Sequence, residues 1–151
     1  MKRIHLASGL ALRGDTILLV ASTYESHHDP LWNLPGGRQE ARELLTQTVE
    51  REVHEETNLR AIVGELAYVA ESYDGERHFT STVFEIAVEG TLALPKGGDH
   101  IIAAQWVPIA ALADRLLVRV VREPLLAYLN GTTRYSGFPK ADISIRWRSS
   151  T

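Results

Sequence analysis

The chain has 151 residues, 44% of them hydrophobic, which is enough for one hydrophobic core, so we expect a single domain over residues 1–151. Its net charge of −3 and the absence of any long apolar run argue against nucleic acid and membrane partners, and the N-terminal residues lack a signal-peptide core, so we expect a cytoplasmic protein. There is no cysteine, which excludes disulfides, zinc–thiolate sites and thiol nucleophiles.

The first part of the chain alternates between extended segments and turn signals. Apolar residues alternate over residues 4–12, which predicts a strand, and residues 16–21 have the composition of a strand buried on both faces. Residues 22–31 are predicted to form a polar loop. A short extended piece at 32–34 should then end at the turn Pro35-Gly36-Gly37.

A helix is predicted next, over residues 44–57, because apolar residues recur there at helical spacing. Beyond it, alternation predicts strands over residues 60–72, 77–89, 91–94 and 101–107. The Asp74-Gly75 pair between the first two of these strands is a strong hairpin signal. The mixture of elements indicates an α+β domain.

Two prolines suggest where the last helices begin. Pro108 suits the first turn of a short helix through Ala113, and Pro124 is predicted to open a final helix that ends at Asn130-Gly131. The polar C-terminal tail, residues 132–151, is expected either to pack as a strand or to fray.

The predicted helix at 44–57 carries an unusual arrangement of acids. Glu52, Glu55 and Glu56 fall within an arc of about 100° on the helix surface, and this arc overlaps an apolar stripe that starts at Leu45. Carboxylates crowded beside a buried surface need a cation, and Mg²⁺ and Mn²⁺ prefer carboxylate and carbonyl oxygens. An ordinary solvated acidic face would explain Glu50, which lies outside the arc, but not this overlap.

The run GRQEARELLTQTVEREVHEETNL, from Gly37 to Leu59, resembles the Nudix box, the signature of the Nudix hydrolase family. It matches at each signature position except Asn58, where the family has Gly; Asn is the next best residue for a left-handed conformation. Ala41-Arg42 stands where many members have Pro-Gly. The resemblance covers roughly residues 4–129 and implies the Nudix fold, a mixed β-sheet held between α-helices.

The resemblance also implies an activity. Such a protein would be a metal-dependent pyrophosphohydrolase that cleaves the diphosphate bond of a nucleoside triphosphate or of a nucleoside diphosphate linked to another group. Mg²⁺ or Mn²⁺ would be held by the Gly36 carbonyl together with Glu52, Glu55 and Glu56. Either Glu52 or Glu55 would take the proton from the attacking water, and the choice between them stays open, because some members use an acid from another loop.

Other residues near the box have narrower predicted roles. Glu43 and Arg51 lie at the two ends of the loop–helix unit, and we predict a structural ion pair between them rather than a substrate contact by Arg51. Arg38 follows the glycine pair and is the candidate phosphate contact. Trp32 and Tyr24 are candidates to stack on a base, although each also suits a core position.

An outer acid or base is expected from a later loop. Many family members place an acid about six residues before the tryptophan that here is Trp106, and the candidates at that distance are Asp99 and His100. Both also suit ordinary turn positions, so both interpretations stay open. The run His27-His28-Asp29 invites a metal site, but a solvated loop is favoured there.

Two other classes of function remain open at this stage. The first is a catalytically silent Nudix-fold module that binds or senses a nucleotide; such a protein should have lost box carboxylates, and this chain keeps them. The second is a scaffold domain, which gives no reason for the clustered acids. The predicted partner is a small nucleotide or nucleoside diphosphate derivative, and a homodimer is left open.

Overall fold

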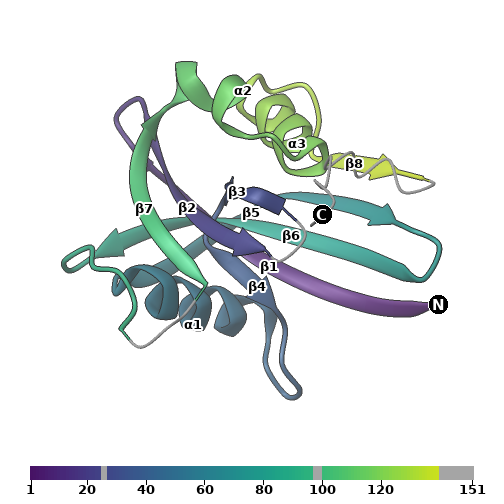
Figure 1. Cartoon of the computed structure of the whole chain (residues 1–151), viewed down its shortest axis with the longest axis horizontal. Helices are drawn as coiled ribbons and strands as arrows, with labels where there is room; N and C mark the ends of the chain where they lie inside the picture. The colour runs from purple at the N-terminus through teal and green to yellow at the C-terminus, as the bar shows by residue number, and fades with distance from the viewer. Residues whose placement is uncertain (25–26, 97–99, 140–151) are drawn as a thin grey trace.

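An 8-stranded mixed sheet forms the centre of the computed structural model, which describes residues 1–24, 27–96 and 100–139 (Figure 1). The strands are β1 (Lys2–Arg13), β2 (Thr16–Tyr24), β3 (His27–Asn33), β4 (Gly36–Arg38), β5 (Arg60–Tyr73), β6 (Arg77–Glu89), β7 (Ile101–Pro108) and β8 (Tyr135–Phe138). Their order is β3-β2-β1-β6-β5-β8, with β4 paired to β1 and β7 paired to β2. The β1–β6 and β5–β8 pairs are parallel and the others antiparallel.

Helices cover both faces of this sheet. The helix α1 (Leu45–Thr57) lies on one face, and α2 (Leu112–Arg115) and α3 (Arg119–Leu129) lie on the other (Figure 1). A short 3₁₀ turn, η1 (Ile109–Ala111), precedes α2. The predicted α+β architecture, with a mixed sheet between helices, is therefore confirmed.

Each face of the sheet has its own apolar core. Leu18 packs in a cluster with Val49 of α1, whereas its neighbour Leu19 packs in the opposite cluster with Leu125 of α3. Successive side chains of a strand point to opposite faces, so a strand covered on both sides must be apolar throughout. This confirms the prediction that residues 16–21 form a strand buried on both faces.

The predicted loop over residues 22–31 is wrong. β2 continues to Tyr24 and β3 begins at His27, and the two strands pair antiparallel, with Ser22 opposite Leu31. Backbone hydrogen bonds make this ladder and do not require apolar side chains, so a polar edge strand looks like a loop in sequence. The side chains of His27 and His28 lie outside the described part of the chain.

Two other short segments also differ from the prediction. Gly36–Arg38 is a short strand paired to β1, not part of a turn. Thr91 to Leu94 is not a strand, because its Ala93 N–H donates to the Thr57 carbonyl at the end of α1 instead of to the sheet. Both differences depend on partners far away in sequence.

The last helix begins earlier than Pro124 suggests. α3 starts at Arg119, because Val118 is extended and its carbonyl accepts the N–H groups of Val121 and Arg122. Pro124 thus lies inside the helix, where it removes one backbone hydrogen bond. Of the C-terminal tail, Tyr135–Phe138 forms β8 against β5, and residues 140–151 lie outside the described part.

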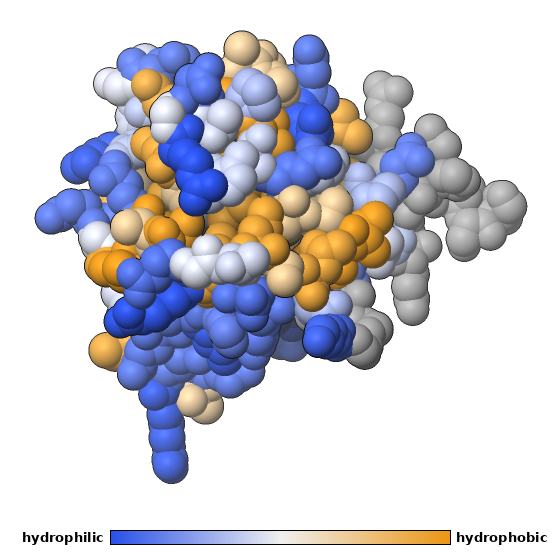
Figure 2. Space-filling view, turned by 90° about the vertical axis from the view of Figure 1, so that its left-hand side faces the viewer, coloured by the Kyte–Doolittle hydropathy of each residue, from blue (hydrophilic) through white to orange (hydrophobic). Residues whose placement is uncertain are grey.

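Part of the surface is apolar. Figure 2 shows an apolar band that crosses one side of the molecule between polar regions. Large apolar side chains that are about half exposed include Leu12, Ile62, Leu66, Ile102 and Leu117. A homodimer stays a prediction.

Within residues 1–24, 27–96 and 100–139, no helix has both the length and the apolar character needed to cross a bilayer.

Two non-glycine residues among those described adopt a positive φ, Arg42 at 65° and Asn58 at 66°. Asn58 ends α1 in the left-handed conformation, and its N–H donates to the His54 carbonyl at 2.9 Å, as predicted for the slot that is Gly in the family. Arg42 stands in the loop before α1, where many family members have Gly, and its Cβ makes this conformation strained.

Relief of this strain should stabilise the protein. We expect Arg42→Gly to raise the free energy of unfolding by about 1 kcal/mol, because glycine adopts this φ without a steric penalty. Arg42→Ala is the matched control, since it removes the same side chain but keeps the Cβ. Urea unfolding of the three proteins measures the effect. Equal stability of the Gly and Ala variants would show that the loop is not strained at this residue.

Candidate active site

The glycine strand β4 presents its outer backbone edge towards α1. The N–H of Gly9 donates to the Pro35 carbonyl and that of Gln39 donates to the His5 carbonyl, both at 2.9 Å. Hydrogen-bonded pairs alternate along an antiparallel ladder, so Gly36 falls in a non-bonded pair. Its N–H and its carbonyl therefore both point away from β1, on the side where α1 lies.

A buried carboxylate meets this edge. The side chain of Glu56 is buried, with 5% of the residue exposed, and its Oε1 accepts the Gly36 N–H at 3.0 Å. The Glu52 carboxylate lies against the next residue, Gly37, where an added Cβ would be 2.5 Å from Glu52 Oε1. Glycine is thus required at both positions for different reasons: a Cβ on Gly37 would meet Glu52 of α1, and a Cβ on Gly36 would meet Ala7 and Ser8 of β1.

The carboxyl groups of Glu52 and Glu56 both lie against the glycine pair, and they interact with each other. Burial is the main cause that raises the pKa of Glu52, and its hydrogen bond with Arg51 acts in the opposite direction. Two carboxylates this close repel each other unless a proton or a cation lies between them. The oxygens of this pair, with the outward carbonyl of Gly36, have the chemistry that hard divalent cations prefer.

Glu55 is more exposed than this pair. Its side chain is 51% exposed and accepts from Arg51 Nη1 at 3.3 Å. In the described ranges, no three acidic or histidine side chains converge tightly enough to make a complete ligand set. A metal at Glu52 and Glu56 would therefore need oxygens from the Gly36 backbone, from water or from substrate as well.

Arg51 joins the loop before α1 to the acidic pair. Its Nε and Nη2 donate to the two oxygens of Glu43 at 2.8 and 3.1 Å, so the predicted ion pair is present in the structure. Its Nη1 donates to Glu52 Oε1 at 2.9 Å, and its Nη2 also donates to the Arg38 carbonyl at 3.0 Å. The hydrogen bond with Arg51 is the largest cause that lowers the Glu43 pKa to about 2, and the hydrogen bond with Glu43 raises the pKa of Arg51.

This loop–helix unit lies within a longer match to a known family. The family model described as the NUDIX domain matches residues 3–129. The chain belongs to the Nudix family. Nudix hydrolases generally use divalent metal ions, which agrees with the oxygen-rich edge formed by Gly36 and the two carboxylates.

Individual relatives support the assignment. A CTP pyrophosphohydrolase of Escherichia coli is 37% identical over 70 residues, so the match spans 46% of this chain and 50% of that protein. The solution structure of the E. coli ORF135 protein superposes with a TM-score of 0.73 at 26% identity, covering 87% of this chain and 91% of that chain. A NUDIX hydrolase from Nitrosomonas europaea has a TM-score of 0.75 at 21% identity, over 89% and 93% of the two chains, which shows the shared fold alone. Together these findings support a hydrolase.

The remaining candidate residues of this Nudix chain are more dispersed. Trp32 is half-buried beside the α2–α3 core, and the Arg115 guanidinium lies 4.7 Å from its ring centroid, so one ring face is already covered. Tyr24, at the end of β2, is 42% exposed, and the Arg38 residue is exposed beside the glycine pair. None of these placements tests a substrate contact.

The loop before β7 is described only in part. His100 is exposed, and its carbonyl accepts the Thr23 N–H at 3.0 Å, which ties the start of β7 to the end of β2. Asp99 lies outside the described residues. The outer acid or base therefore stays a prediction.

One polar residue of the Nudix helix was not predicted from the sequence to belong to the site. Thr48 is fully buried, and its hydroxyl donates to Glu43 Oε1 at 2.7 Å. Its position one residue before Val49, on the apolar side of the helix, could have indicated this role, because a hydroxyl buried there needs a hydrogen-bond partner.

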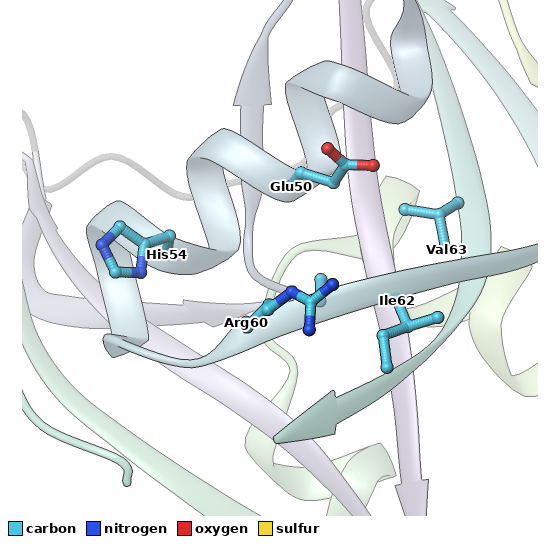
Figure 3. Close-up of a pocket in the computed structure, with 6 residues that line it drawn as sticks. Glu50, His54, Arg60, Ile62 and Val63 are labelled. Carbon is cyan, nitrogen blue, oxygen red and sulfur yellow. The ribbon is translucent and has the colours of Figure 1, made fainter. Parts of the chain in front are cut away.

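The opposite side of the Nudix helix borders a surface hollow of about 480 Å³. Figure 3 shows Glu50 and His54 projecting from α1 on this side, with Arg60, Ile62 and Val63 of β5 across from them. Glu50 is two residues before Glu52, which turns it about 200° around the helix axis. It is therefore a suitable reference for tests of the Glu52–Glu56 side.

Proposed function

We propose that this chain is a divalent-metal-dependent pyrophosphohydrolase that acts on a nucleoside triphosphate or on a nucleoside diphosphate linked to another group. The observation that carries the proposal is that the Glu52 and Glu56 carboxyl groups both lie against the backbone of the Gly36-Gly37 pair. Membership of the Nudix family and the partial match to a CTP pyrophosphohydrolase support it.

The proposed chemistry assigns separate tasks to the residues of the box. Glu52, Glu55, Glu56 and the Gly36 carbonyl would hold Mg²⁺ or Mn²⁺. The bound ion would neutralise the diphosphate and lower the pKa of a coordinated water. Either Glu52 or Glu55 would then accept the proton as water attacks phosphorus, in line with the leaving phosphate. Glu55 is the more exposed of the two, so it reaches solvent water more easily.

The substrate would be held mainly through its charge. Arg38 would contact a phosphate oxygen, because its exposed position next to the glycine pair borders the acidic site. Tyr24 and the uncovered face of Trp32 would contact the base. The name of the E. coli relative makes CTP the first nucleotide to test.

A panel of substrates tests this function. With Mg²⁺ or Mn²⁺ present, we expect release of a nucleoside monophosphate from at least one substrate, together with pyrophosphate from a nucleoside triphosphate or with the phosphorylated second group from a nucleoside diphosphate derivative. Nucleotide binding without turnover would instead favour a silent sensor. A preference for inorganic polyphosphate, with no nucleotide cleaved, would overturn the proposed substrate class.

Metal removal gives a second test. Mg²⁺ or Mn²⁺ should raise the melting temperature by binding the folded state, and excess EDTA should abolish both this rise and turnover. The double variant Glu52→Gln, Glu56→Gln should show no rise with metal. Turnover at full rate in EDTA would contradict the metal-dependent mechanism.

Asp99 and His100 are proposed to supply an outer acid or base. Asp99→Asn and His100→Ala should each lower kcat by roughly tenfold or more, and His100→Ala should also change the pH–rate profile. Initial rates between about pH 6 and 9 measure both effects. If both variants match the wild-type rate across that range, the base belongs to the box helix.

A further inference from the structure

Thr48 is a polar residue buried in the first turns of α1. No part of the residue is exposed, and its hydroxyl has two acceptors, Glu43 Oε1 at 2.7 Å and the Leu44 carbonyl at 3.3 Å. A helical threonine commonly bonds the carbonyl four residues earlier. Here the shorter contact is the one to the carboxylate, which is also the stronger kind of acceptor.

The acceptor oxygen is held by several donors. Glu43 Oε1 accepts from the Thr48 hydroxyl, from Arg51 Nη2 at 3.1 Å and from the Glu40 N–H at 3.1 Å. Of these, the Thr48 hydroxyl makes the shortest contact. Because Thr48 belongs to α1, its hydroxyl favours the rotamer of Glu43 in which the carboxylate lies against the helix.

Arg51 links Glu43 to the acidic pair of Glu52 and Glu56. Arg51 donates Nε and Nη2 to Glu43, and from the same planar group it donates Nη1 to Glu52 Oε1 at 2.9 Å. A guanidinium is rigid, so the orientation of one edge determines where the other edge lies. A change in the Glu43 rotamer would therefore rotate the donor that holds Glu52.

We propose that Thr48 is a positioning residue of the metal site, whose hydroxyl orients Glu52 through Glu43 and Arg51. The inference rests on the proposed function, because it assumes that Glu52 binds the metal. Thr48 touches neither metal nor substrate. It acts by reducing the number of arrangements that the Arg51 contacts can take before a cation binds.

Variants at Thr48 separate this role from simple packing. Thr48→Val removes the hydroxyl at nearly constant volume, whereas Thr48→Ser keeps the hydroxyl and removes the methyl. Thr57→Val is a matched control in the same helix, because Thr57 is also fully buried and its hydroxyl bonds only backbone groups, those of Val53 and Leu59. All three variants should lose some stability in urea, since each disturbs a buried side chain.

Free Mn²⁺ measured by electron paramagnetic resonance, without substrate, gives the decisive reading. We expect Thr48→Val to weaken Mn²⁺ binding by about tenfold or more, as is typical when a residue that orients a ligand is lost. Thr48→Ser and Thr57→Val should bind Mn²⁺ like the wild type. With saturating Mn²⁺, the kcat of Thr48→Val should return close to the wild-type value.

The outcomes distinguish the two levels of inference. If Thr48→Val binds Mn²⁺ as tightly as the wild type, or if Thr48→Ser weakens binding equally, the positioning role is wrong and the metal site stands. If the wild type itself fails to bind Mn²⁺, the proposed function fails and the positioning role fails with it. If Thr48→Val does not fold, Thr48→Ala removes the same hydroxyl with a smaller side chain, and its Mn²⁺ affinity decides in the same way.

Discussion

Replacing Glu56 by Gln should lower kcat by a factor of about 10³ or more and leave the fold intact. Glu56 is buried between the Glu52 carboxyl and the Gly36 N–H, so its charge lies where a metal would bind. Gln keeps an oxygen that can accept the Gly36 N–H, so the local structure should persist. Without metal the variant should be at least as stable as the wild type, because one of two neighbouring carboxylates has been neutralised.

Steady-state rates and melting temperatures, each with and without Mg²⁺, measure this effect. Glu50→Gln is the matched control, because it makes the same change on the opposite side of the same helix (Figure 3) and should keep the wild-type rate and metal response. A folded Glu56→Gln variant with kcat within tenfold of the wild type would remove Glu56 from the metal site. Failure of the variant to fold would equally contradict a ligand role.

Replacing Glu43 by Gln should reduce both stability and rate. The carboxylate accepts from Arg51 Nε and Nη2 and from the Thr48 hydroxyl, and Gln cannot accept at both of its terminal atoms. The same contacts orient Glu52, so we expect a fall in kcat/KM of roughly 10- to 100-fold. Chemical unfolding and initial rates give the two readings. Unchanged unfolding behaviour would remove the structural assignment of Glu43.

The stability lost in this variant should depend on pH in a defined direction. The pKa of Glu43 is lowered from 4.5 to about 2 in the folded protein, chiefly by the hydrogen bond with Arg51. A lowered pKa means that the charged group stabilises the fold above about pH 4.5, and that this contribution disappears as the pH falls towards 2. The difference in stability between the wild type and Glu43→Gln should therefore be largest above pH 4.5 and shrink on acidification.

Glu40→Gln is the control for this titration. The Glu40 carboxylate is 3.7 Å from Arg51 Nη1, and its side chain is 67% exposed, so solvent screens the contact. We expect little change in stability at any pH in this variant. A loss equal to that of Glu43→Gln would mean that general charge around Arg51, and not the specific pair, stabilises the loop.

The sequence alone was sufficient for the features that depend on near neighbours. The helix α1 follows from its apolar spacing, the left-handed Asn58 from its place after the last turn, and the β5–β6 hairpin from Asp74-Gly75. The acidic arc on α1 also follows from spacing, since positions on a helix are set by the 3.6-residue repeat. These are short-range constraints, which each local segment carries in its own residues.

Tertiary structure decided the features that depend on distant partners. β3 and β8 are strands because β2 and β5 supply their hydrogen bonds. Pro124 is tolerated inside a helix that begins at Arg119 and packs Leu125 in the core. Of the acids on one helix face, Glu52 and Glu56 lie against the β4 backbone, while the Glu55 side chain is half exposed. Helical periodicity gives the direction in which a side chain leaves the helix, but the neighbouring strand and the competing hydrogen bonds determine where its oxygens come to lie.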